Sequence, residues 1–334
     1  MKFSRLFVPA ACLLLAPLLN TPALAADCGP LKQLASLPLA TGPGGITTLP
    51  VTINDQPRRL LLDTAGGISN LSQAAVTAMD LHTLSTGGGR LLSRNGNASS
   101  TYVNVSKLGI GNIVGTDLQF MVSPNPQMGA NPAFPFDGVL AGDLLREDME
   151  MDFPNGKLNF FSPDHCDGKV VYWNAKTIAI VPFSTQRPGV MGNRDTHIRV
   201  PVTLDGKHLT AVISTGIARS LISAKTARYD FDVTADSPGS TPLGVAGGPQ
   251  NKIFGHVFQS LSLEGITVNN PHLAVMPDVI GARDPANQTA TGNRTRRVDD
   301  GLEPDLTIGM DILKSLHLYA AMREQKLYIT SNAP

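Results

Sequence analysis

One carboxylate and one hydroxyl stand at matching places in two similar segments, and their surroundings could support acid–base chemistry. Asp63 ends a run of leucines, and Ser214 ends an equally apolar run 151 residues later. Thr64-Ala65 follows the acid, and Thr215-Gly216 follows the serine. Two carboxylates placed together share one proton and can activate water, because they cannot both ionise. A serine carries no charge at ordinary pH, so such an acid pair is incomplete within one chain.

The chain contains an internal duplication. Residues 49–55 resemble 200–206, and both are alternating strands that end in a turn. Three more pairs of segments match in the same order, with a one-residue slip where 69–71 is aligned with 219–221: 60–65 with 211–216, 105–111 with 261–267, and 139–145 with 307–313. Matched blocks in one order indicate two copies of a single unit.

The elements that position these residues are short strands joined by turns. Gly (32 residues) and Pro (25 residues) are abundant, and charged residues make up only 16% of the chain, which disfavours helical bundles. Each copy predicts a strand, a turn with the polar triplet, a short helix, a hairpin, further strands and a turn with an aspartate. Asp143 and Asp311 are expected to cap helix N-termini.

These blocks resemble the retropepsin-like and pepsin-like aspartic peptidases. That family has two apolar residues before Asp-Thr/Ser-Gly, and an apolar-apolar-Gly turn well downstream. Residues 61–66 and 139–142 supply both features in the first copy. The resemblance extends over nearly the whole chain after its first 25 residues. It implies an all-β, bilobal pepsin-like aspartic peptidase fold, made of two retropepsin-like β-barrel lobes with short helices and a cleft between them.

The resemblance also implies a role for each residue of the two triplets. Asp63 would be the catalytic carboxylate, and Ser214 would occupy the partner position. Thr64 and Thr215 would cross-bond the two loops in the arrangement called the fireman's grip. The remaining loop-support positions are Ala65, Gly66 and Gly216. Ala65 replaces the family's central glycine, and Gly66-Gly67 leaves no hydroxyl there to orient the acid.

The family's flap would fall on a hairpin of the first lobe. The best candidate is the segment from Leu91 to Val103, which turns at Asn95-Gly96. Asn-Gly between alternating residues is the strongest short hairpin signal. The equivalent hairpin of the second lobe is expected to turn near Gly247-Gly248.

The first 25 residues have the pattern of a signal peptide. Lys2 and Arg5 precede a short apolar stretch, and Ala23-Leu24-Ala25 supplies the small residues of a cleavage site. We therefore expect a secreted or periplasmic protein that has no membrane association after cleavage. Residues 26–168 would form the N-terminal lobe and residues 169–334 the C-terminal lobe.

Two cysteines remain after that cleavage. Cys28 and Cys166 form an even pair in an oxidising compartment, which predicts a disulfide between them. The alternative is a pair of free buried thiols. No metal site is expected, because these cysteines lack histidines at the intervals of tetrahedral zinc sites. No cofactor is expected either, since Gly87-Gly88-Gly89 lacks the Lys-Ser/Thr of a phosphate loop.

Charge and motifs exclude other activities. The 27 basic residues balance 27 acidic ones, so there is no basic excess to neutralise a nucleic acid. The motif Gly-x-Ser-x-Gly of serine hydrolases does not occur in the sequence.

Two hypotheses for the function remain. The first is an aspartic-type endopeptidase that acts on extended peptides or unfolded proteins through Asp63 and is impaired by Ser214. The second is a non-catalytic pseudopeptidase that binds peptides in the cleft. We expect a monomer, and the alternative is a homodimer in which the first lobes of two chains pair.

Overall fold

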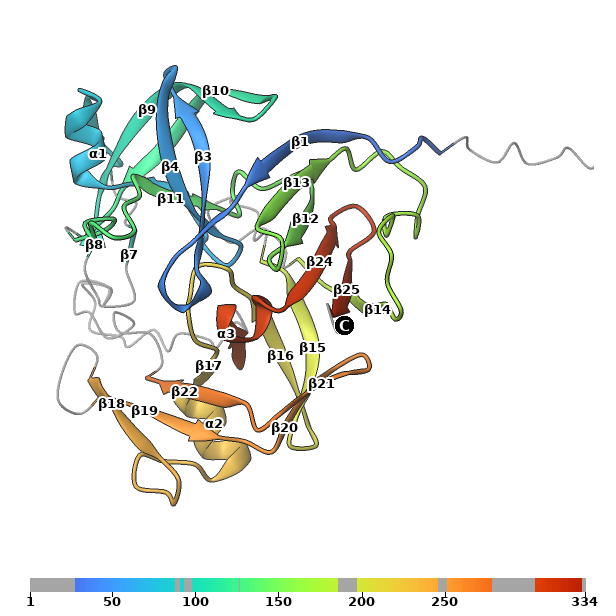
Figure 1. The fold of residues 1–334 in the computed structure, drawn as a ribbon. Helices are drawn as coiled ribbons and strands as arrows, with labels where there is room; N and C mark the ends of the chain where they lie inside the picture. The colour runs from blue at the N-terminus through green and yellow to red at the C-terminus, as the bar shows by residue number, and fades with distance from the viewer. Residues whose placement is uncertain are drawn as a thin grey trace, which may run out of the picture.

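The computed structural model describes residues 28–87, 91–92, 98–125, 127–185, 197–245, 251–277 and 304–331. Figure 1 shows two β-rich lobes, with strands from both halves of the chain side by side between them. The architecture is therefore the all-β, bilobal fold that the sequence predicts. Within the described ranges, no helix is both long and apolar enough to cross a membrane.

The first lobe is an eight-stranded sheet that closes on itself. Its strands in spatial order are β2 (Ala40–Thr41), β3 (Thr47–Ile53), β4 (Gln56–Asp63), β11 (Gly138–Ala141), β5 (Asn70–Leu71), β10 (Ile113–Val122), β9 (Thr101–Ile110) and β6 (Thr83–Ser85). β3 also pairs with β9, which closes the central strands into a barrel. Three further elements are the 3-10 helix η1 (Pro43–Gly45), the helix α1 (Gln73–Ala78) and the hairpin of β7 (Leu91–Leu92) with β8 (Ala98–Ser99).

The second lobe repeats this plan with nine strands. In spatial order they are β18 (Thr241–Val245), β19 (Lys252–Val257), β22 (His272–Met276), β17 (Leu221–Ser223), β23 (Leu306–Ile308), β16 (Lys207–Ile213), β15 (Arg199–Leu204), β20 (Ser260–Leu263) and β21 (Ile266–Asn269). Its helices are α2 (Ala224–Phe231) and α3 (Met310–Leu313). The pairing of β15 with β20 corresponds to that of β3 with β9. The long strands β9 and β10 are thus each divided in two here.

The same tight turn joins the first two barrel strands of each lobe. Asn54 and Asp55 lie between β3 and β4, with φ of 49° and 63°, and Asp205 and Gly206 lie between β15 and β16, with φ of 45° and 82°. Two consecutive positive φ values define the type I′ turn, which suits the twist of a hairpin and favours Asn, Asp and Gly. The turns therefore set the register of both barrels at equivalent places.

A six-stranded antiparallel sheet joins the two lobes. Its order is β1 (Gln33–Pro38), β13 (Lys157–Phe161), β12 (Asp148–Asp152), β24 (Leu316–Ala321), β25 (Lys326–Ser331) and β14 (Ala179–Pro182). The first three strands come from the first half of the chain and the last three from the second half. The lobe boundary predicted at residues 168–169 lies in the segment between β13 and β14.

A pseudo-twofold axis passes through the centre of this sheet. Glu150 of β12 lies directly opposite Tyr319 of β24. The hairpins that follow these strands begin at the equivalent pairs Asp152–Lys157 and Ala321–Lys326. Counted back from those hairpins, Glu150 and Tyr319 are equivalent positions of the two repeats. The duplication is therefore symmetric about this one pair.

One face of the six-stranded sheet is apolar and packs on the barrels. Side chains alternate between the two faces of a strand. In β12, Met149 and Met151 lie on the apolar face and belong to the main hydrophobic core, together with Leu318 of β24. The same core includes barrel residues of both lobes, such as Leu62 and Ile213. The two lobes consequently share one continuous core.

The opposite face of this sheet holds a buried polar network. Nε2 of His165 lies 2.6 Å from Oδ2 of Asp148, and Nε2 of His317 lies 2.7 Å from Oε1 of Glu150. Tyr319 donates a hydrogen bond of 3.3 Å to Asp148. All five side chains are buried. Buried charges cost free energy unless they are paired. The stability of this network therefore depends on the hydrogen bonds between His165 and Asp148 and between His317 and Glu150.

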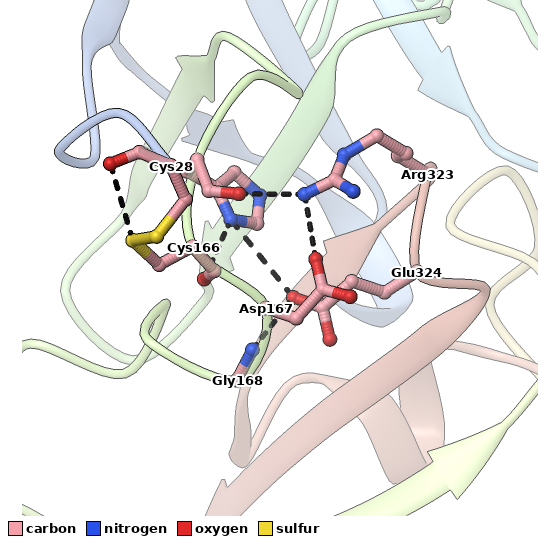
Figure 2. The surroundings of a disulfide bond; sticks show 7 residues. Cys28, Cys166, Asp167, Gly168, Arg323 and Glu324 are labelled. Carbon is pink, nitrogen blue, oxygen red and sulfur yellow. Dashed lines mark hydrogen bonds and ion pairs between the residues drawn. A yellow bond between two sulfur atoms is a disulfide. The ribbon is translucent and has the colours of Figure 1, made fainter. Parts of the chain in front are cut away.

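The predicted disulfide between Cys28 and Cys166 is present. It ties the segment before β1 to the segment between β13 and β14, and Figure 2 shows its surroundings. Arg323, in the turn between β24 and β25, donates a hydrogen bond of 2.6 Å to Asp167. Glu324, from the same turn, accepts one of 3.0 Å from the backbone N–H of Gly168. The disulfide-bonded segment is therefore also held by the second half of the chain.

Candidate active site at the lobe junction

Two equivalent strands deliver the triplets to the junction of the lobes. β4 ends at Asp63, which pairs in parallel register with Ala141 of β11. β16 ends at Ile213, one residue before Ser214, and pairs in the same way with Ile308 of β23. Each triplet loop thus begins beside the downstream apolar turn of its own repeat.

The two threonines cross-bond the loops. The backbone N–H of Thr64 donates to Oγ1 of Thr215 at 3.1 Å, and the N–H of Thr215 donates to Oγ1 of Thr64 at 3.3 Å. Each hydroxyl then donates across the junction, Thr64 to the carbonyl of Ile213 at 2.7 Å and Thr215 to that of Leu62 at 2.8 Å. Both threonines are buried, so these four bonds fix the relative position of the loops.

The carboxylate and the serine meet across this junction. Oγ of Ser214 donates a hydrogen bond of 3.3 Å to Oδ1 of Asp63, and the N–H of Ala65 donates to the same oxygen at 3.0 Å. Asp63 is half-buried, whereas Ser214 is 1% exposed. The serine therefore lies opposite the acid and holds it by a hydrogen bond, but it presents almost no surface of its own.

Glycines make room for the carboxylate. A Cβ built on Gly216 would clash with Cγ of Asp63, lying closer to it than real Cβ atoms come to other atoms. A Cβ on Gly66 would lie 3.1 Å from Oδ2 of Asp63 and 2.9 Å from Cβ of Ala141. The side chain of Asp63 thus fills the space beside both glycines. Ala65, in contrast, has a backbone that needs no positive φ.

The two downstream aspartates anchor serines, and neither is the N-cap residue of a described helix, so the predicted N-cap position was wrong: Asp311 lies inside the first turn of α3, where it also accepts from the N–H of Ile312. Asp143 accepts from the N–H and hydroxyl of Ser69, at 3.0 and 2.6 Å. Asp311 accepts the same pair from Ser220, at 3.0 and 2.7 Å. The N-cap of α3 is Gly309, which has no side chain to offer. Each aspartate therefore ties the far end of a triplet loop to the downstream turn.

These anchors complete a second layer of support. Ser69 Oγ accepts from the N–H of Ala141 at 2.9 Å, and Ser220 Oγ accepts from the N–H of Gly309 at 2.9 Å. Burial raises the pKa of Asp143 above its ordinary value, although the hydrogen bonds from Ser69 oppose that effect.

Sequence reasoning missed the serine anchors. It aligned the segment 69–71 with 219–221 after a one-residue slip, but the structure places Ser69 and Ser220 in the same role. Their separation is 151 residues, the same as that of the triplets. The unbroken spacing of two serines, each six residues after its triplet begins, was the signal that could have found them.

The predicted flap lies partly outside the described residues. β7 and β8 pair in antiparallel register, Leu91 with Ser99 and Leu92 with Ala98. The turn at Asn95-Gly96 lies outside the described residues, as does the turn near Gly247-Gly248. β18 and β19 flank the latter as antiparallel strands. Among the residues described, no three His, Cys, Asp or Glu side chains form a group that could hold a metal ion.

A comparison with protein-family models identifies the family of this chain. A family model described as aspartyl protease matches residues 49–143 and 200–312, which together exceed half of the chain. No curated protein matches. Among solved structures, the crystal structure of basic 7S globulin from soybean is similar, with 12% sequence identity and a TM-score of 0.45, covering 90% of this chain and 95% of that one. The two matched regions begin and end on the repeats that carry Asp63 and Ser214, and the chain belongs to the aspartyl protease family.

Proposed function

We propose that this protein hydrolyses peptide bonds with Asp63 as its catalytic carboxylate. One observation carries the proposal: Asp63 is held at the lobe junction by Ser214 and Ala65, between two loops whose threonine cross-bonds are complete. A purely structural turn has no need of a half-buried carboxylate at this position, because a neutral residue would serve it equally well. The proposed activity is therefore that of an aspartic-type endopeptidase with one acid.

The proposed mechanism uses the carboxylate of Asp63 as a proton acceptor. As a general base, the carboxylate would take a proton from water while the water oxygen bonds to the peptide carbonyl carbon and the π electrons of C=O move onto the carbonyl oxygen. It would then give that proton to the amide nitrogen as the C=O bond re-forms and the C–N bond breaks. Ser214 holds Oδ1 of Asp63 in place but supplies no acid to protonate the carbonyl oxygen. We expect slow hydrolysis that depends on orientation and binding.

The proposed substrate is an extended peptide or an unfolded protein. The strands of the flap hairpin, β7 and β8, would pair with an extended backbone, which gives affinity through main-chain hydrogen bonds. Export to the periplasm or the extracellular space is part of the proposal. It is supported by the disulfide between Cys28 and Cys166, because such bonds persist in oxidising compartments. We expect a monomer, since pairing two first lobes would require breaking the shared core.

Casein digestion tests the proposal. The purified protein is incubated with unfolded casein from acid to neutral pH, with and without a statine-type inhibitor, and fragments are measured by mass spectrometry. We expect slow cleavage that the inhibitor blocks and that Asp63→Asn abolishes. Cleavage that persists in Asp63→Asn would show a contaminating or different activity and overturn the assignment.

Ser214 favours a second candidate, a non-catalytic peptide-binding protein. A buried hydroxyl at the partner position preserves the junction but removes the second acid. In this case Asp63 would only accept hydrogen bonds from a bound peptide. Binding of casein peptides without turnover, measured by calorimetry and retained in Asp63→Asn, would identify this function instead.

A further inference from the structure

A cavity of about 150 Å³ lies in the second half of the chain, and neither Asp63 nor Ser214 is among its lining residues. Its walls come from β16, β20, β21, β23, α3, β24 and β25, so the barrel and the six-stranded sheet both face it. Figure 1 shows α3 beside β16 and β24. Eleven of the thirteen lining residues are Ile, Leu or Val. The cavity is therefore almost wholly aliphatic.

The two polar residues of the lining have their hydrogen bonds engaged. Asp311 accepts from the N–H and hydroxyl of Ser220 and from the N–H of Ile312. Ser315 donates its hydroxyl hydrogen to the carbonyl of Ile312 at 3.1 Å. A peptide backbone or another polar group would lose its hydrogen bonds to water on entering and gain few in return. The occupant that fits is consequently apolar.

The volume limits the size of that occupant. An aliphatic cavity of roughly 150 Å³ is large enough to bind benzene or xenon. A single hydrocarbon ring or a short branched chain of about six carbons therefore matches the space. A length of polypeptide does not, because both its volume and its polar backbone are excluded.

The lining residues differ in exposure in a way that defines an entrance. Ile213 and Ile308 are each 1% exposed and form the floor. Ile266, Val268 and Ile312 are half-buried and form part of the rim. A small apolar molecule can thus reach the floor from the side of β21 and α3.

The floor of the cavity is continuous with the grip. Ile213 immediately precedes Ser214, and its carbonyl accepts the hydroxyl of Thr64 at 2.7 Å. Asp311, on the rim, anchors Ser220 at the other end of the same loop. From these contacts we infer that the cavity is a binding site for a small hydrocarbon group, and that its occupancy stabilises the loop of Ser214.

The first lobe suggests how to close the site. The equivalent hairpins place Phe160 of β13 at the position of Ile329 in β25, and Met149 at that of Leu318. The second repeat therefore has the smaller side chain, Ile329, where the first repeat carries Phe160. Ile329→Phe fills the cavity with a residue that the fold already accepts in the other lobe. Ile329→Val, which enlarges the cavity slightly, is the matched control.

Benzene is the probe for the test. It is titrated into the disulfide-bonded protein, and methyl resonances of Ile, Leu and Val are followed by NMR together with the thermal midpoint. We expect saturable shifts confined to the lining methyls and the Thr64 amide, and a midpoint raised by a few degrees. The response should persist in Ile329→Val and disappear in Ile329→Phe.

Two further measurements keep the outcome decisive. Val268→Phe blocks the rim at a half-buried position and replaces Ile329→Phe if that variant does not fold. Asp63→Asn should bind benzene as the parent does, so that binding is scored independently of peptide hydrolysis. Absence of saturable shifts, or shifts centred elsewhere, would refute the site. Shifts of the lining methyl resonances without a shift of the Thr64 amide resonance would show that occupancy of the cavity does not affect the loop of Ser214.

Discussion

His317 of β24 and Glu150 of β12 form a buried pair across the middle of the sheet that joins the lobes, with Nε2 2.7 Å from Oε1. Asn159 donates a second hydrogen bond to Glu150 at 2.9 Å. The ring of Trp173 stacks on His317, with centroids 3.9 Å apart. The pair therefore links strands from the two halves of the chain and is covered by the segment between them.

This pair predicts a loss of stability in acid. Burial alone would raise the pKa of Glu150, but hydrogen bonds from His317, Tyr172 and Asn159 outweigh it, so the pKa lies below its ordinary value of 4.5. A carboxyl whose pKa is lowered by folding stabilises the protein above the unfolded pKa. That contribution is lost as the pH falls below 4.5 and through the folded value. Urea unfolding between pH 3 and pH 6, followed by the fluorescence of the single tryptophan, measures it.

Glu150→Gln isolates the effect. Removing one partner of a buried pair costs about 3–5 kcal/mol, and the variant should show a flatter dependence on pH than the parent. Asp55→Asn is the control, because Asp55 pairs with Lys107 on the surface and such pairs contribute about 0–1 kcal/mol. If the free energy of unfolding of Glu150→Gln falls with decreasing pH as steeply as that of the parent, other carboxyl groups cause the loss of stability in acid.

Thr215→Val tests the fireman's grip. The substitution keeps the shape of the side chain but removes the hydroxyl that accepts from Thr64 and donates to Leu62. Two buried backbone groups lose a partner, at about 1–3 kcal/mol each. Thr210→Val, on the exposed side of β16, should change the free energy of unfolding by less than about 0.5 kcal/mol. Equal effects of the two variants in urea unfolding would contradict a special role for Thr215.

Gly216→Ala tests the packing around Asp63. Its new methyl group would meet Cγ of the carboxylate, so either the loop or the acid must move. We expect a destabilisation of about 1–3 kcal/mol, the usual cost of overpacking, together with loss of any hydrolysis. Gly67→Ala is the control, because a Cβ at that position meets nothing within 4 Å. Thermal unfolding and the casein assay should leave Gly67→Ala close to the parent.

The repeats and the triplets could be predicted from the sequence because each matching block is a short run of adjacent residues. The third pair of blocks was misaligned, with Gly109 matched to Gly265, whereas the register pairs Gly109 with Thr52 and its counterpart Ser262 with Thr203. The alignment matched the two glycines because they are identical residues. In the second lobe, however, the strand equivalent to β9 is divided into β19 and β20, so the glycines lie at different places in the fold.

The buried polar network could not be predicted in this way. Residues 148–152 alternate acid and methionine, a pattern typical of a strand with one face in water. The structure buries that face because His165 and the segment around Trp173 fold over it from outside the strand. Contacts between residues far apart in the chain leave no periodic signal in either segment, so only the fold reveals them.

Ser214→Asp tests whether the junction retains the geometry of a working acid pair. Oγ of Ser214 lies 3.3 Å from Oδ1 of Asp63, so a carboxyl group there would share a proton with Asp63. We expect casein hydrolysis to rise by at least about 100-fold, the lower end of the range for positioned acid–base catalysis. Its rate should also depend on pH through a second titrating carboxyl group. Ser214→Ala, which removes the hydroxyl and adds no acid, is the matched control and should show no gain. A folded Ser214→Asp protein without increased hydrolysis would mean that the loops hold Asp63 for binding and not for catalysis.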